Sequence, residues 1–340
     1  MKRNLTRILK YSLIKLSLMP ISIWIISSLV FLLLRAAPGG PCDALLGTGA
    51  DQQARDNCRA ENGLNEPLIN QYFSYLSELI RLNLGESTSN SEPVMNVITR
   101  VLPASIELGI FAIIFAALIG FPLGYLGLKR KGSWVDYFSR ITGISSYAIP
   151  PFWGAMMAQL FFSVIFRIFP IGGRLPTFYQ APNITGFLIL DSILDNNLFA
   201  LKATIYHLLL PSITLGFLLS GIFSRSLRLN LDKSLKSDFF DAATCRGINN
   251  KNLMLNYAIP NALLPILTIT GLTIASLAGG ALLIEITFSW PGIALKLQEA
   301  IFQRDYNMVQ GIAIVTSIII VSINLLIDIF IAFIDPRINY

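Results

Sequence analysis

Six long apolar runs alternate with polar stretches along this chain of 340 residues. Each run approaches or exceeds the ~20 residues that a helix needs to cross the hydrocarbon layer of a bilayer. Hydrophobic residues make up 54% of the chain and charged residues 14%, proportions that are unusual for a soluble domain. We therefore predict an all-α polytopic membrane protein with six transmembrane helices. The runs cover residues 16–34, 104–126, 142–166, 204–223, 261–284 and 309–334.

The polar stretches divide the chain into three parts. Residues 1–35 hold the N-terminal segment and first span, residues 36–103 form a long loop region, and residues 104–340 hold the remaining spans with a polar loop at 236–260. Basic residues before the first run also fit a cleaved signal peptide. Its ~19 apolar residues exceed the ~7–15 of such a signal, so we predict an uncleaved span.

The distribution of charge predicts the orientation. The N-terminus, the second and fourth loops and the C-terminal tail carry 16 basic and five acidic residues, against 10 and 12 in the other loops. By the positive-inside rule, both termini are cytoplasmic and residues 36–103 are external. The net charge of +6 is therefore a signal of topology, and we expect a lipid bilayer and no nucleic acid as partner.

The first external loop contains a predicted helix and two cysteines. Leu68, Phe73, Leu76 and Ile80 are spaced for one face of a helix over residues 66–82, which could cap the external mouth or contact a partner. Cys42 and Cys58 lie in the same loop. An oxidising compartment would permit a disulfide worth ~3 kcal/mol; two free thiols are the alternative.

Proline residues interrupt the apolar pattern at two places. Pro150-Pro151 breaks the third run, either as a kink against a neighbouring helix or because Ser145, Ser146 and freed carbonyls face a translocation path.

The second place is the last external segment. There, Trp290 suits a membrane interface, and Pro291-Gly292 predicts a turn that leads into a short amphipathic helix. We predict that Trp290, Pro291 and Gly292 belong to an external gate.

Few ionisable residues fall inside the runs. Asp328 and Asn324 share one face of the last run. For Asp328 we favour a structural contact with another helix or subunit over a proton relay. Glu107 and Glu285 lie near span ends, and we expect them to reach partners at the interface.

The polar loop at 236–260 contains a short helix with a defined start and end. In SDFFDAATCRGINN, Ser237 or Asp238 can cap the first turn, and Gly247 follows the last. Acidic residues at the start and Arg246 at the end suit the helix dipole. Such a helix predicts a docking element; a helix lying on lipid headgroups is the alternative. The expected contact residues are Phe239, Phe240, Asp241, Ala242, Ala243, Arg246 and Gly247.

The same loop resembles a known family. DAATCRGINNKNLMLNYAIPNALLP is similar to the coupling loop of ABC importer permeases, with Asp241 in place of the usual Glu. Further stretches resemble the first permease of the dipeptide, oligopeptide and nickel group, and ITGFLILDSIL resembles the dipeptide type in particular. Asn83 departs from the family's usual Asp. These further stretches are LNLGEST, RVLPASIELG, FPIGGR, LLLPSITLG, EITFSWPGIALKLQEAI, RDYNMVQG and NLLIDIFIAFIDPRI.

The resemblance implies the type I ABC importer permease fold in a bacterial inner membrane, with residues 236–260 as the coupling loop. It implies a second, paralogous permease subunit, two ABC ATPase subunits and an extracytoplasmic peptide-binding protein as partners. The ATPase subunits would bind ATP and Mg, and we expect no cofactor on this chain. The expected function is a pore-forming subunit that takes up dipeptides or oligopeptides; nickel chelates and haem-like cargo are alternatives.

Other classes of protein fit the sequence less well. An ion-driven secondary transporter would want charged or discontinuous helices at mid-membrane in both halves of the chain, and only Pro150-Pro151 hints at one. An intramembrane enzyme would need paired catalytic residues. His207 is the only histidine. In GLKRKGS, Ser133 follows the second glycine, where a phosphate-binding loop has lysine. We expect no catalytic residue and no metal site, and hence no enzyme.

Overall fold

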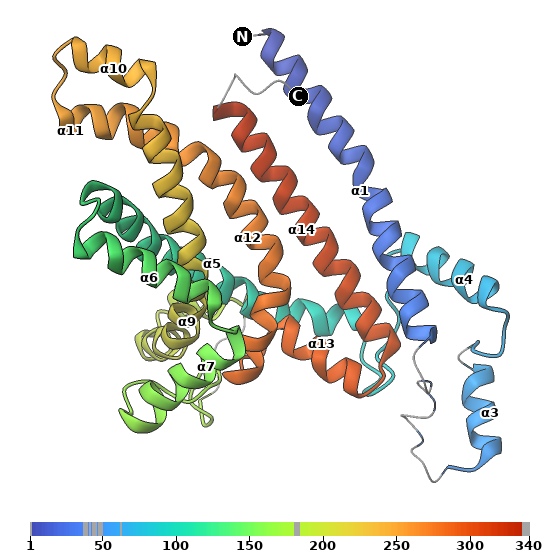
Figure 1. The fold of residues 1–340 in the computed structure, drawn as a ribbon. Helices are drawn as coiled ribbons and strands as arrows, with labels where there is room; N and C mark the ends of the chain where they lie inside the picture. Colours follow the sequence, from blue (N-terminus) through green and yellow to red (C-terminus); the bar gives the residue numbers. More distant parts are fainter. Residues whose placement is uncertain are drawn as a thin grey trace.

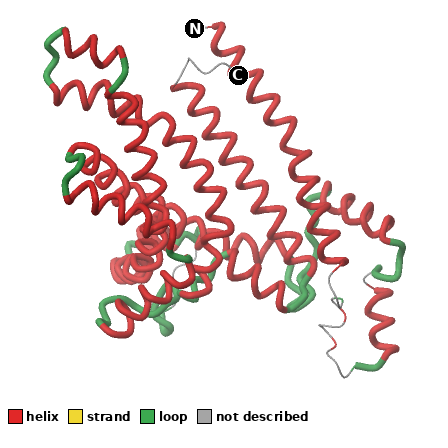
Figure 2. Tube along the Cα trace, in the orientation of Figure 1, coloured by secondary structure: helices red, strands yellow, loops and turns green. Residues whose placement is uncertain are grey.

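The computed structural model describes residues 2–36, 40, 42, 46, 50–61, 63–179 and 184–334. Apart from loops and an isolated bridge between Glu86 and Pro93, the described residues are helical (Figure 2). Short π-helical segments follow α7 (Leu160–Ile165) and precede α12 (Met254–Ala258). The helices are α1 (Lys2–Ala36), α3 (Gln52–Glu61), α4 (Leu68–Ile80), α5 (Val94–Lys129), α6 (Trp134–Ala148), α7 (Pro151–Gln159), α8 (Leu188–Leu194), α9 (Leu198–Leu235), α10 (Asp238–Cys245), α11 (Asn250–Leu253), α12 (Ile259–Thr287), α13 (Ile293–Phe302) and α14 (Tyr306–Ile334).

Among the described residues, α1, α5, α9 and α14 are each long and apolar enough to cross a membrane. Two bent pairs of helices raise the number of candidate spans to six. One pair is α6 with α7, which meet at 106°, and the other bends by 41° between Leu263 and Pro265. The all-α, polytopic fold class is confirmed, and the third and fifth predicted spans are not straight.

The break in the third span is sharper than the predicted kink. Ile149 and Pro150 both have extended backbone, with ψ of 121° and 132°. Each precedes a proline, whose ring disfavours the helical conformation of the residue before it. The helix therefore ends at Ala148 and a new one starts at Pro151, where a missing N–H costs nothing.

α5 and α9 form the most extensive helix pair, because small residues let their backbones approach. Gly120 and Gly124 of α5 face Ser220 and Ser224 of α9. A Cβ atom at either glycine would lie 2.6 Å from a serine carbonyl oxygen. Small residues four apart are typical of close helix packing in membranes.

α1 lies at the edge of the molecule against α14 (Figure 1). Lys15 Nζ and Asp328 Oδ2 are 2.6 Å apart, which confirms the predicted contact of Asp328 with another helix. Asn324, one turn earlier, lies instead beside Gly271 of α12.

The helices outside the bundle lie at its two ends. α10 and α11 project from the end where α1 begins, and α3 lies at the other end (Figure 1). α4 and α13 fall within the helices predicted for residues 66–82 and after Gly292, so both predictions are confirmed.

Cys42 and Cys58 form a disulfide beside α3, with Cα atoms 5.9 Å apart. Cys245 is free and exposed on α10. The bridge closes a loop with a sequence separation of 16, for which chain entropy gives about 3 kcal/mol.

We expect this bridge to be present in the protein isolated from its native membrane. Without reductant, a thiol reagent should label Cys245 and leave Cys42 and Cys58 unlabelled. After reduction, an impermeant reagent added outside should label Cys58. Labelling of both external cysteines before reduction would contradict the bridge, and reaction of Cys58 only in inverted vesicles would contradict its external position.

Candidate functional site

α10 begins at the residue that the sequence indicated. Ser237 has the extended backbone of an N-cap (φ −92°, ψ 149°), and Asp238 and Asp241 occupy the first turn. The Ser237 hydroxyl donates to the Ser234 carbonyl at 2.5 Å rather than capping the helix. The carboxylates near the positive end of the helix dipole therefore provide the favourable charge at this end.

α10 ends in a Schellman motif. Gly247 has a left-handed φ of +75°, which a residue with a Cβ adopts only at a cost. The Gly247 N–H donates to the Thr244 carbonyl at 2.9 Å, and the Ile248 N–H donates to the Ala243 carbonyl at 3.4 Å. This pair of hydrogen bonds turns the chain sharply back towards the bundle.

The predicted contact residues of α10 divide between two faces. Phe239, Ala242 and Arg246 follow helical spacing on an exposed face, and Asp241 is also exposed. Ala243 is buried, so its predicted accessibility is wrong.

Phe240 is partly buried, which makes its predicted accessibility only partly right. It packs against an apolar cluster that includes Leu231 of α9 and Ala258 and Ala262 near the start of α12. One face of α10 is thus free for a partner while the other grips the bundle.

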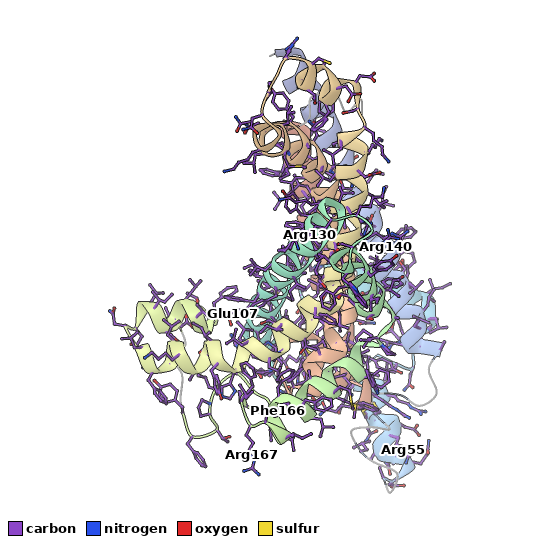
Figure 3. All side chains as sticks on the ribbon, turned by 60° about the vertical axis from the view of Figure 1, so that its left-hand side comes forward. Arg55, Glu107, Arg130, Arg140, Phe166 and Arg167 are labelled. Carbon is purple, nitrogen blue, oxygen red and sulfur yellow. A yellow bond between two sulfur atoms is a disulfide. The ribbon has the colours of Figure 1, made fainter. Side chains whose placement is uncertain are left out.

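A polar junction centred on Asp136 ties α6 to α9. The buried Asp136 carboxylate accepts from Arg140 at 3.0 Å and pairs with Arg228 of α9 at 2.5 Å. It also accepts from the Gly132 N–H at 3.0 Å. Figure 3 marks Arg140, together with Arg130, near the α5–α6 turn. From the sequence alone these residues count only among the charges of the loops, because the pairing of Asp136 with α9 depends on the fold.

At the opposite end, a buried carboxylate fixes α13. Glu285 is fully buried near the end of α12. It accepts from the Ser105 hydroxyl of α5 at 2.6 Å and from the N–H groups of Ala294 and Leu295 at 2.9 Å each. The Ser105 hydroxyl oxygen also accepts from the Ile293 N–H at 2.8 Å. Three helices therefore meet at one carboxylate; Glu285 has its partners within the protein, and its level at the membrane interface stays a prediction.

The predicted gate residues belong to this junction. Trp290 is fully buried, and its indole N–H donates to the Ala104 carbonyl of α5 at 2.8 Å. The Arg174 guanidinium lies 5.7 Å from its ring. Trp290 therefore anchors the segment instead of sitting at a membrane interface, and Pro291 is exposed at the turn.

Gly292 is required for a reason that the sequence did not reveal. Its backbone is extended (φ −101°, ψ −178°), so no left-handed turn demands glycine. A Cβ atom at this position would overlap the Glu285 carboxylate. The absence of a side chain is what allows the carboxylate to reach the start of α13.

Glu107 of α5 joins a neighbouring network at the same end of the bundle. It is buried and pairs with Arg174, and its other oxygen accepts from the Ile189 N–H of α8 at 3.0 Å. Glu107 likewise has its partners within this chain, and their level at the membrane interface stays a prediction.

Asp191 of α8 closes the loop before that helix. Burial raises its pKa, but the hydroxyl of Thr185 and the N–H groups of Ile184, Thr185 and Gly186 donate to it and leave the pKa below its ordinary value. The Asp191 carboxylate thus closes the loop before α8, and Glu107 joins that loop to α5.

The residues proposed for a translocation path have mixed surroundings. Ser146 is buried against Gly221 of α9, and its hydroxyl donates to the Gly143 carbonyl at 3.0 Å. The carbonyls of Ser145 and Pro150 accept from the N–H groups of Ile149 and Gly154, each at 3.0 Å. These two carbonyls are therefore satisfied by local backbone N–H groups. The carbonyls that Pro150 and Pro151 leave without a helical donor are those of Ser146 and Tyr147, and a path along them and Ser145 stays a prediction.

The described residues hold no group of His, Cys, Asp and Glu that could bind a metal ion. His207 lies instead with Nδ1 3.1 Å from the carbonyl oxygen of Gly172. Two features of the site therefore stand out. At one end of the bundle, α10 has one exposed face and one packed face, and at the other end α13 is fixed by Glu285.

This fold defines a class: a polytopic α-helical membrane protein with helices outside the spans at both ends. The chain belongs to the family described as "Binding-protein-dependent transport system inner membrane component", whose model matches residues 109–340. A second model, described as "Binding-prot-dependent transport system membrane comp, N-term", matches residues 8–109. The family is a membrane component of transport systems and works with a binding protein.

Individual relatives cover nearly the whole chain. The probable D,D-dipeptide transport system permease protein of Escherichia coli K12 is 35% identical over 92% of this chain and 92% of its own. The dipeptide transport system permease protein of Alkalihalophilus pseudofirmus is 36% identical over 91% and 93%. The oligopeptide transport system permease protein of Bacillus subtilis 168 is 32% identical over 96% and 99%.

Proposed function

We propose that this chain is a pore-forming permease subunit of an ATP-driven importer of dipeptides or oligopeptides. The observation that carries the proposal is similarity, over more than nine-tenths of the chain, to proteins named as permeases for these substrates. The geometry of α10 supports a role in coupling, because Phe239 and Arg246 are exposed while Phe240 is held in the bundle.

In this proposal, two ATPase subunits bind ATP and Mg and dock on the cytoplasmic loops of the permeases, with the exposed face of α10 as the contact on this chain, and this chain binds no cofactor. Closure of the ATPases displaces α10, and Phe240 carries the displacement to α9 and α12 through their shared apolar cluster. A second, paralogous permease completes the pore, and an external binding protein delivers peptide. Since α13 is tied to α5 and α12 through Glu285, the three helices move together.

The proposed orientation places both termini in the cytoplasm. α1 begins at the end of the bundle that carries α10, which agrees with the positive charge of both segments (Figure 1). A fluorescent or protease-cleavable tag at either terminus should report a cytoplasmic position in intact cells. A tag that an external protease removes without breaking the membrane would overturn this orientation.

Uptake by vesicles tests the function. The chain is reconstituted with its partner subunits, and accumulation of a labelled dipeptide is measured with ATP supplied and the ion gradients collapsed. We expect uptake to require ATP and the binding protein. Uptake driven by an ion gradient alone would favour a secondary transporter. ATP-dependent uptake of a nickel chelate or haem, with none of peptide, would change the substrate and keep the mechanism.

A further inference from the structure

One side of the helix α4 contacts the rest of the protein through aromatic side chains. Tyr72 and Tyr75 face α1, where each ring centroid lies 5.4 Å from that of Phe31. The Arg35 Nε donates to the Gln71 amide oxygen at 2.8 Å. These contacts hold α4 across the outer end of α1, from which it runs sideways (Figure 1).

Apolar side chains on another side of α4 are exposed. Ile69, Phe73 and Ile80 are 68%, 64% and 83% exposed, and their spacing of four and seven residues places them along one stripe. Within α4, the sole charged residue is Glu78, and it lies with polar Ser74 on the far side of the helix from the stripe.

The contact with α1 shows the level of α4 relative to the span. The Tyr72 and Ser28 hydroxyls are 2.6 Å apart. Ser28 lies within the candidate span Lys15–Ala36, eight residues before its end, or about 12 Å along the helix axis. At this level α1 itself exposes Leu29, Leu32 and Leu33 by 56–62%, a surface that suits lipid and not water.

We propose that α4 is a membrane-interface helix, with Ile69, Phe73 and Ile80 inserted among the lipids of the outer leaflet. The stripe continues the lipid-facing surface of α1, and an interfacial helix places its apolar face ~5–10 Å into the boundary of headgroups and acyl chains. The helix thus anchors the external loop region to the membrane, independently of which solute is transported.

Spin labels on the two faces of α4 test the proposal in the full-length chain. Cys245→Ser removes the free thiol, and Phe73→Cys or Ile80→Cys introduces a label on the stripe. Ser74→Cys, an exposed position on the polar face, is the matched control. In phosphatidylethanolamine–phosphatidylglycerol liposomes, relaxation by oxygen reports lipid, and relaxation by a water-soluble nickel chelate reports solvent.

We expect oxygen to dominate at positions 73 and 80 by several-fold and the nickel chelate to dominate at position 74. Dominance of the nickel chelate at positions 73 and 80 would overturn the proposal, because the stripe would then face water. An immobile label reached by neither reagent would overturn it as well, since a protein surface would cover the stripe. Positions 73 and 80 lie on the same stripe. If one of these two cysteine variants is not produced in the membrane, the other alone still reports whether the stripe faces lipid.

Discussion

Gly292→Ala is expected to dislodge α13 and lower uptake more than tenfold, although it adds a single methyl group. The added Cβ would overlap the Glu285 carboxylate, which is fully buried. Moving this carboxylate strands the N–H groups of Ala294 and Leu295 and the hydroxyl of Ser105. Each buried polar group left unpaired costs about 1–3 kcal/mol. Gly292→Val should be more severe, because its branched side chain adds overpacking of the same site.

The measurements are thermal unfolding in detergent, uptake in liposomes and co-purification with the ATPase subunits. We expect a lower unfolding temperature and little uptake, while the ATPases still bind at the distant α10. Gly143→Ala is the matched control, since a Cβ atom there would meet nothing within 4 Å. Glu285→Gln keeps the size of the side chain and removes the charge, so it should show an intermediate loss. If Gly292→Ala unfolds and takes up peptide as the wild type does, transport does not depend on the contacts of Glu285 with the start of α13.

Local features of the sequence predicted α10 well. The polar residues before Asp238 and the glycine after Arg246 set a start and an end that depend on neighbouring backbone alone. Which face is covered is a different matter, because Phe240 is buried by residues of α9 and α12 that lie elsewhere in the chain. Helical spacing could name both faces but could not choose between them.

The charged residues show the same limit. Glu107 and Glu285 lie near the ends of predicted spans, and this position predicts partners without naming them. Their partners are Arg174 and the backbone start of α13, and neither can be paired with them from sequence alone. The proline pair likewise signals an interruption, while the 106° turn depends on how α6 and α7 pack on α9.

Gly247→Val is expected to uncouple ATP hydrolysis from transport while the protein still inserts and folds. Gly247 has φ +75°, and a Cβ atom there would meet nothing within 4 Å. The variant is therefore strained only through its backbone, by ~1–2 kcal/mol. Relief of this strain redirects the chain after α10 and so shifts the exposed face on which we propose that an ATPase subunit docks. Gly63→Val is the matched control, with φ +64° and equally open space in the external loop.

Asp241→Lys is expected to have a comparable functional effect for a different reason. Asp241 is exposed in the first turn of α10, so reversing its charge costs only ~0.3–1 kcal/mol through the helix dipole. That is too little to unfold the helix, and a large loss of coupling must come from a lost contact with a partner. Asp241→Asn removes the charge without reversing it and should give a smaller loss. The measurements are co-purification with the ATPase subunits and peptide-stimulated ATP hydrolysis in liposomes. If Gly247→Val and Asp241→Lys bind the ATPases and couple hydrolysis to uptake at wild-type rates, α10 is not the transmission element, and force must enter the bundle by another route, such as the α5–α6 turn.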